Sequence, residues 1–147
     1  MKKIILMLSV FAFLCQGCTD RFDRINRKYV LYNGTEHEVK VDIYERGKFR
    51  STSSIKGKGV IDEATSSNDA GKSPSVSQAF GMDSVVVTYN NKKRQIYYYS
   101  DSTYMSETIP ETRHDLLAES VYEVINNELY RFTFTEADYE NAEEIGG

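Results

Sequence analysis

From residue 28 onward the chain alternates apolar and polar residues, which is the pattern of half-buried β-strands. The alternation is clearest over residues 39–44, and residues 29–32 form an apolar segment shortly before them. Between the two lies Asn33-Gly34-Thr35, a turn sequence. We therefore expect the two segments to form a hairpin. The expected register pairs Leu31 with Val41 and Tyr29 with Ile43, so that odd-numbered residues of both strands share one face.

A second hairpin is predicted over residues 83–89 and 94–99, with its turn at Asn90-Asn91-Lys92-Lys93. Lys92-Lys93-Arg94 make this turn basic. The expected pairing places Val87 opposite Ile96 and Val85 opposite Tyr98. Both faces of this pair then carry apolar residues, which is typical of strands in the middle of a sheet. The basic turn itself is expected to be a solvated tip whose charges oppose strand addition.

The last hairpin is predicted over residues 121–125 and 129–135, joined by a three-residue loop. This loop length places Glu123 opposite Arg131 as a cross-strand ion pair. On the other face the same register pairs Tyr122 with Phe132 and Val124 with Tyr130. The sequence Thr135-Glu136-Ala137-Asp138 then matches a capping box, which predicts a short helix through Ala142.

Weaker patterns occupy the rest of the chain. Residues 49–55, rich in Ser and Thr, predict an edge strand after a turn at residues 46–48. Residues 57–61 contain too much glycine to assign, residues 64–77 have the composition of a polar loop, and residues 100–120 have that of a long crossover.

About seven short strands with almost no helix favour an all-β fold. We expect residues 28–147 to form an antiparallel β-sandwich of immunoglobulin-like architecture with a short C-terminal helical turn. The chain has no Trp, and beyond residue 18 it has no cysteine pair, so a true immunoglobulin domain is not indicated.

Length and charge narrow the functional classes. The 147 residues fit one domain. The 18 basic and 22 acidic residues give a net charge of −4, so we expect no nucleic-acid partner, because such partners are held through cationic contacts to phosphate.

Residues 1–17 have the pattern of a secretory signal peptide. Lys2 and Lys3 precede an apolar run, Ile4–Leu14, that is broken only by Ser9. Eleven helical residues reach about half of the ~30 Å hydrocarbon core of a bilayer, so this run is too short to be a spanning helix. Removal of the peptide would take away two lysines and no acid, which changes the net charge from −4 to −6.

The end of this segment predicts lipid attachment. Gly17 directly precedes Cys18, and a small residue before a cysteine after an apolar run resembles the bacterial lipobox, in which the cysteine is acylated and the signal is removed before it. Cys15 is the competing candidate, but it follows the bulky Leu14. The alternative is an ordinary secreted protein in which Cys18 is a free thiol. With Cys18 acylated, residues 18–27 would be a polar tether between the lipid and the fold.

No catalytic or metal-binding pattern is evident. His37 and His114 are isolated, and zinc requires three or four ligands. The acidic residues lack the spacing of a calcium-binding loop, and a carboxylate pair for glycosidic cleavage cannot be chosen without geometry. We therefore expect no cofactor and no metal.

Two kinds of candidate site remain. Tyrosine is abundant, and outward rings supply rigid contact area for a sugar or a protein. Tyr97 and Tyr99 share one strand face and are the binding candidates. The triplets beginning at Asp83 and Asp101 resemble acceptors for O-glycosylation, of which Ser102, in a loop, is a better candidate than Ser84, in a strand.

The chain resembles small lipoproteins of Bacteroidales type that have no assigned activity. The resemblance rests on Gly17-Cys18, on Asp83–Tyr89 (DSVVVTY) and on Tyr130–Ala142 (YRFTFTEADYENA). It implies a palmitate-bearing protein of the outer membrane, periplasmic or surface-exposed. We expect a non-catalytic binding or accessory module for a protein or glycan, which it would meet through the 64–77 loop or exposed tyrosines. The alternatives are a hydrolase with a carboxylate-lined cleft and a purely structural envelope component.

Overall fold

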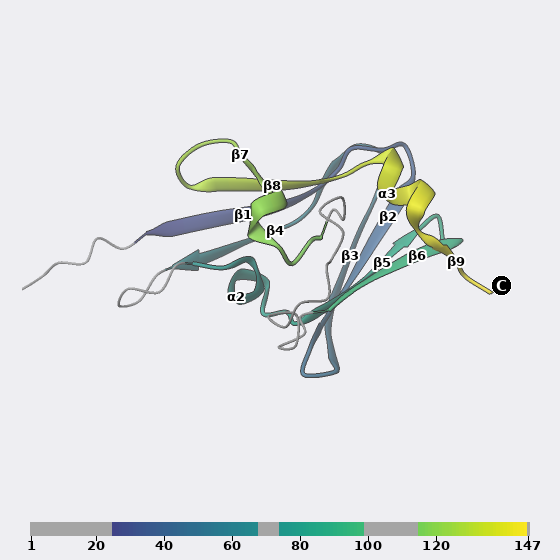
Figure 1. Ribbon diagram of the computed structural model, residues 1–147, viewed down its shortest axis with the longest axis horizontal. Coiled ribbons are helices and arrows are strands. Elements are labelled where there is room, and N and C mark those ends of the chain that lie inside the picture. The colour runs from purple at the N-terminus through teal and green to yellow at the C-terminus, as the bar shows by residue number, and fades with distance from the viewer. Residues whose placement is uncertain (1–24, 68–73, 99–114, 147) are drawn as a thin grey trace, which may run out of the picture.

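The computed structural model describes residues 25–67, 74–98 and 115–146, and it shows two β-sheets packed face to face (Figure 1). The predicted all-β sandwich is confirmed. The four-stranded sheet has the order β4 (Gly59–Ser67), β1 (Asn26–Asn33), β8 (Leu129–Phe134), β7 (Glu123–Val124). The five-stranded sheet has the order β3 (Lys48–Lys56), β2 (Glu38–Glu45), β5 (Ser84–Tyr89), β6 (Lys93–Tyr98), β9 (Glu143–Glu144).

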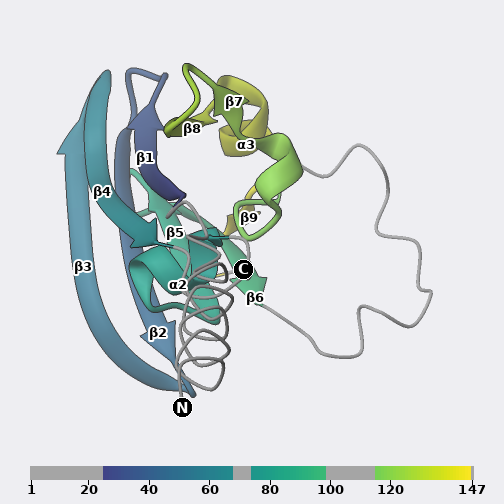
Figure 2. The same ribbon diagram turned by 90° about the vertical axis from the view of Figure 1, so that its left-hand side faces the viewer.

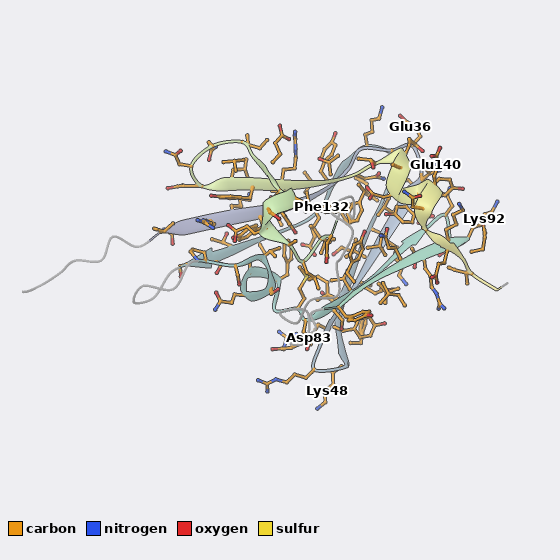
Figure 3. The ribbon with its side chains drawn as sticks, viewed as in Figure 1. Glu36, Lys48, Asp83, Lys92, Phe132 and Glu140 are labelled. Atoms are coloured by element: carbon orange, nitrogen blue, oxygen red, sulfur yellow. The ribbon has the colours of Figure 1, made fainter. Side chains whose placement is uncertain are left out.

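The core lies between the sheets and is built mainly from alternate residues of β1, β2, β5 and β8. The odd-numbered residues of β1, β2 and β5 face inward, while Phe132 and Phe134 enter from β8; Figure 3 labels Phe132. Their rings meet edge to face with centroids 4.9 Å apart, which is a favourable aromatic geometry. The period-two pattern of the sequence therefore describes which side chains are buried.

The first predicted hairpin is wrong, because β1 and β2 lie in different sheets. β1 pairs with β4 in antiparallel and with β8 in parallel orientation, while β2 pairs with β3 and β5. The buried Asn33 side chain redirects the chain: its Oδ1 accepts hydrogen bonds from the backbone N–H and the hydroxyl of Thr35 at 2.9 and 2.8 Å. The odd-numbered residues do share one core, but they reach it from opposite layers. The parallel β1–β8 pair is also a departure from a wholly antiparallel sandwich.

The β2–β3 connection has the predicted position and places β3 at a sheet edge, as expected. Glu45 pairs with Lys48, and the two residues between them, Arg46 and Gly47, have φ values of 52° and 71°. A two-residue loop with positive φ at both positions matches the right-handed twist of the flanking strands. Figure 2 shows β3 beside β4 at one edge of the molecule, where the Ser53 hydroxyl donates to Asp62 at 2.9 Å.

The β5–β6 hairpin forms, but its register differs from the predicted one by a single residue. Val85 pairs with Tyr97 and Val86 with Ile96, because the loop has three residues. Asn90 and Asn91 in this loop have φ values of 52° and 55°, which asparagine tolerates better than most residues. The shift puts Tyr97 in the core and Tyr98 on the outer face.

The predicted register and helix cap at the C-terminal end are confirmed, but the first strand is shorter than the predicted residues 121–125. It is β7, Glu123–Val124, because Glu119–Val121 form a short 3₁₀ helix. Glu123 pairs with Arg131, and their side chains form an ion pair with a separation of 2.5 Å. Thr135 caps α3 (Glu136–Asn141) through a complete capping box, in which Asp138 accepts from the Thr135 backbone N–H at 2.7 Å. Figure 1 shows α3 at the end of the sandwich where β8 and β6 come together.

The predicted polar loop is wrong at both of its ends. Residues 64–67 belong to β4, and Val76 begins α2 (Val76–Phe80), whose cap is Ser75. Val76 is buried in the core, and the carbonyl of Pro74 accepts a hydrogen bond from the buried Tyr29 hydroxyl at 3.1 Å. At the other end of the domain β1 begins at Asn26, so the last two residues of the predicted tether are in a strand.

Candidate functional site

Three aromatic side chains form one row on the outer face of the five-stranded sheet. Phe49 of β3 pairs with Tyr44 of β2, Tyr44 pairs with Ser84 of β5, and Ser84 pairs with Tyr98 of β6. We call Phe49, Tyr44, Ser84 and Tyr98 the aromatic row. The inward residues on either side of it, such as Ile43 and Val85, are buried in the core, so strand alternation directs the row outward.

The row is strongly exposed. Tyr98 has 68% and Phe49 has 57% of its surface accessible. The Tyr44 and Phe49 rings meet edge to face with centroids 5.8 Å apart, which leaves ring surface open. Tyr44 and Tyr98 are separated by two strand spacings, or roughly 10 Å. A ligand that covered the row would therefore lie across the strands rather than along them.

The charges beside the row are paired within the protein. Arg50 forms an ion pair with Glu45, and Lys40 lies 2.9 Å from Asp42. Figure 3 shows Asp83 and Lys48 near the lower tip of the molecule, by the β2–β3 turn.

Asp83 organises the backbone and hydroxyl groups at this end of the row. It accepts hydrogen bonds from the Ser84 hydroxyl at 3.0 Å and from the Arg46 backbone N–H at 2.5 Å. With its acids already bound to cations and donors, the face presents rings and hydroxyl groups and has little net charge.

A groove of about 530 Å³ lies on the outer face of the other sheet. Its lining is mixed, comprising Lys28, Val30, Tyr32, Val60, Glu63, Ile125, Asn126, Glu128, Leu129 and Arg131. Glu63 lies 2.8 Å from the Lys28 ammonium, and Arg131 binds Glu123 and stacks over the Tyr32 ring at 5.5 Å. A glycosidase requires two carboxyl groups facing one bond, whereas here Glu63 faces a lysine.

His37 belongs to a hydrogen-bonded cluster at the α3 end. Its Nε2 lies 3.0 Å from Glu136, its Nδ1 lies 2.8 Å from the Asn90 amide nitrogen, and its ring stacks on Tyr139 at 3.8 Å. The Asn90 Oδ1 in turn accepts from the Glu38 backbone N–H at 2.8 Å. These contacts join the β1–β2 loop, the β5–β6 loop and α3. Within the described ranges no three His, Cys, Asp or Glu side chains gather to hold a metal.

The structure corrects the tyrosine candidates. Tyr97 is only 1% exposed and packs in the core, so it is not available to a ligand. Of the two described members of the Tyr97-Tyr98-Tyr99 triplet, Tyr98 is the exposed one. Tyr99 lies outside the described residues, as do Cys18, Ser102 and His114. Ser84, the weaker glycosylation candidate, lies within the aromatic row.

Two members of the row, Tyr44 and Phe49, were missed in the sequence. Tyr44 stands at an even position of a strand whose odd positions are apolar, which marks it as outward. Phe49 follows the β2–β3 turn so closely that it pairs with Tyr44 across the hairpin. The signal was therefore present, but it required the turn geometry to be known first.

Comparisons of the chain with protein-family models, with curated proteins and with solved structures find no match. Among the described residues, no helix has the length and apolar character needed to cross a membrane.

Proposed function

We propose that this chain is a lipid-anchored protein of the cell envelope whose sandwich is a non-catalytic binding module for a glycan or a protein. The observation that carries the binding role is the aromatic row, in which Tyr98 and Phe49 are more than half exposed on one sheet face. Large exposed aromatic side chains are costly in water, and they are enriched where proteins bind partners.

The anchor is proposed from the sequence. Cys18 would carry the acyl chains, residues 1–17 would be removed, and the outer membrane would be the site of attachment. Each buried CH₂ contributes about 0.8 kcal/mol, so two or more chains would give lasting attachment. O-glycosylation at Ser102 is a further proposal for the same envelope protein.

The binding role is preferred over a hydrolase because of the groove. A concave site with two converging acids would favour an enzyme. Two acids, Glu63 and Glu128, line the groove, but they come from opposite sides of β1, and Glu63 is held by Lys28. A purely structural component is disfavoured by the exposure of Tyr98.

The test is binding to envelope fractions and to a panel of neutral and acidic polysaccharides. We expect the double variant Phe49→Ala/Tyr98→Ala to lose most of its binding, because each exposed ring supplies contact area that alanine lacks. Ile145→Ala is the matched control, since Ile145 is an exposed apolar residue, 45% accessible, away from the row. Unchanged binding by the double variant would refute the role of the row.

A further inference from the structure

The tether predicted by the sequence restricts which end of the sandwich lies near the membrane. β1 begins at Asn26, and Cys18 is eight residues earlier. Eight residues span at most about 29 Å when fully extended, which is about the length of an eight-residue strand. If Cys18 is acylated, the end of the domain at which β1 begins must therefore stay close to the bilayer.

The β7–β8 loop forms part of this same end. Leu129, the first residue of β8, pairs with Lys28, and the Lys28 backbone N–H donates to the Glu128 carbonyl at 2.6 Å. Figures 1 and 2 both show the loop beside the start of β1. We call the start of β1 and this loop the anchor-side end.

The anchor-side end exposes several apolar side chains. The structure exposes eight large hydrophobic side chains in the ranges it describes, and three of them lie here: Ile25 at 46%, Val124 at 58% and Ile125 at 42%. The basic side chains nearby are paired, Lys28 with Glu63 and Arg27 with Glu119. Because these cations are paired with carboxylates, they would not approach the lipid interface as unpaired charges.

We propose that the anchor-side end docks on the lipid surface, with Ile25, Val124 and Ile125 inserted among the headgroups. This inference rests on the acylation of Cys18 in the proposed function. The occupant is a bilayer because the short tether holds this end within its reach, so that even weak apolar contacts are made at high effective concentration. Each inserted side chain gains by leaving water.

The absence of tryptophan from the chain provides a direct test. Ile125→Trp places a single indole at the anchor-side end. Ile145→Trp is the matched control, because Ile145 is similarly exposed and its backbone N–H binds the Lys92 carbonyl, at the opposite end of the long axis where Figure 3 labels Lys92. The protein with its native N-terminus is reconstituted into phosphatidylcholine vesicles that carry brominated acyl chains.

We expect the Ile125→Trp indole to be quenched several-fold more than the Ile145→Trp indole, with matching far-ultraviolet circular dichroism for both variants. Equal quenching would overturn the docking surface.

A second arm separates this failure from a failure of the anchor. A chain beginning at Cys18 keeps all the described contacts, since these lie within residues 25–146, and its one thiol is coupled to a maleimide lipid. Equal quenching in this coupled chain would refute docking alone. Native protein that carries no acyl chain on Cys18 by mass spectrometry would instead refute the anchor.

Discussion

At the scale of single residues, the contacts of His37 determine where its proton resides. A backbone N–H can only donate, so the Asn90 atom that faces the Glu38 N–H must be the oxygen. The amide nitrogen of Asn90 therefore faces Nδ1 of His37 and donates to it. Nδ1 must accept, and Nε2 carries the hydrogen that is donated to Glu136.

The first prediction is that neutral His37 is the Nε2–H tautomer. Two-bond ¹H–¹⁵N correlation spectra at mildly alkaline pH distinguish the two tautomers, and His37→Gln assigns the signal. Asn90→Asp replaces the donating amide with an acceptor, so we expect it to shift the ring toward the Nδ1–H form. An Nδ1–H ring in the unmodified protein would contradict the network.

The buried tyrosines give the second prediction. Burial raises the pKa of both Tyr89 and Tyr122 above the ordinary value. At neutral pH both the folded and unfolded states are protonated, so there is no effect. Above about pH 10 the unfolded tyrosines ionise first, and stability then falls by about 1.4 kcal/mol per pH unit for each residue. Urea unfolding near neutral pH and at about pH 11 should therefore differ by roughly 3 kcal/mol.

Phenylalanine variants separate the two tyrosines. The Tyr89 hydroxyl is buried and has no hydrogen-bond partner among the described residues, so Tyr89→Phe should cost little at neutral pH and should remove its share of the alkaline loss. The Tyr122 hydroxyl donates to the Leu116 carbonyl at 2.9 Å, so Tyr122→Phe should cost about 1–3 kcal/mol at neutral pH. Equal costs for the two variants would contradict this assignment.

At the scale of elements, local pairings were predictable from the sequence and distant ones were not. The β7–β8 register follows from a short loop and one ion pair. The prediction of a β1–β2 hairpin was wrong because β1 pairs with β8, about a hundred residues later. Alternation of apolar and polar residues specifies which face of a strand is buried, but not which strand it pairs with. The one-residue error in β5–β6 arose because the positive φ values of Asn90 and Asn91 allow a three-residue loop.

Gly34 marks the crossing between the layers and carries the third prediction. A Cβ at this position would lie 2.8 Å from Cγ2 of Thr133 and 2.9 Å from the Phe134 carbonyl. Gly34→Ala should therefore destabilise the protein by about 1–3 kcal/mol through overpacking. Adding Thr133→Ser removes the methyl contact and should recover part of that loss in denaturant unfolding, whereas no recovery would show that the carbonyl contact dominates.

The capping box provides the fourth prediction. Thr135→Ala removes the hydroxyl that accepts from the Asp138 N–H and donates to its carboxylate. Loss of such a cap costs about 1–2 kcal/mol, measurable by thermal or urea unfolding. Ser120→Ala, at an exposed position, is the control and should change stability little. A Thr135→Ala protein as stable as this control would show that α3 is held by packing alone.

At the scale of the whole molecule, the two-layer architecture and the inward and outward positions were accessible from the sequence, but the candidate site was not. Which tyrosine of the triplet faces outward depends on the length of one turn, and the row appears only when four strands are placed side by side. The anchor, by contrast, is proposed from the sequence alone, because Cys18 lies outside the described residues.

The final prediction concerns this anchor. Cys18→Ser should move the protein from the membrane fraction to the soluble fraction of the cell, because no thiol remains at the acylation position. Cys15→Ser should leave it in the membrane fraction, since that residue belongs to the removed signal. The reverse result, detected by immunoblotting of the two fractions, would assign the anchor to Cys15.

The parallel β1–β8 pair has a consequence for how the protein folds. During synthesis β1 cannot pair with its neighbour β8 until about a hundred further residues have been made, since Tyr29 aligns with Tyr130. Such long-range closure slows folding, because a large loop must be ordered before the contact forms. Until then the backbone N–H and C=O groups along one edge of β1 have no partner strand. A polypeptide truncated before β8 would never complete this sheet.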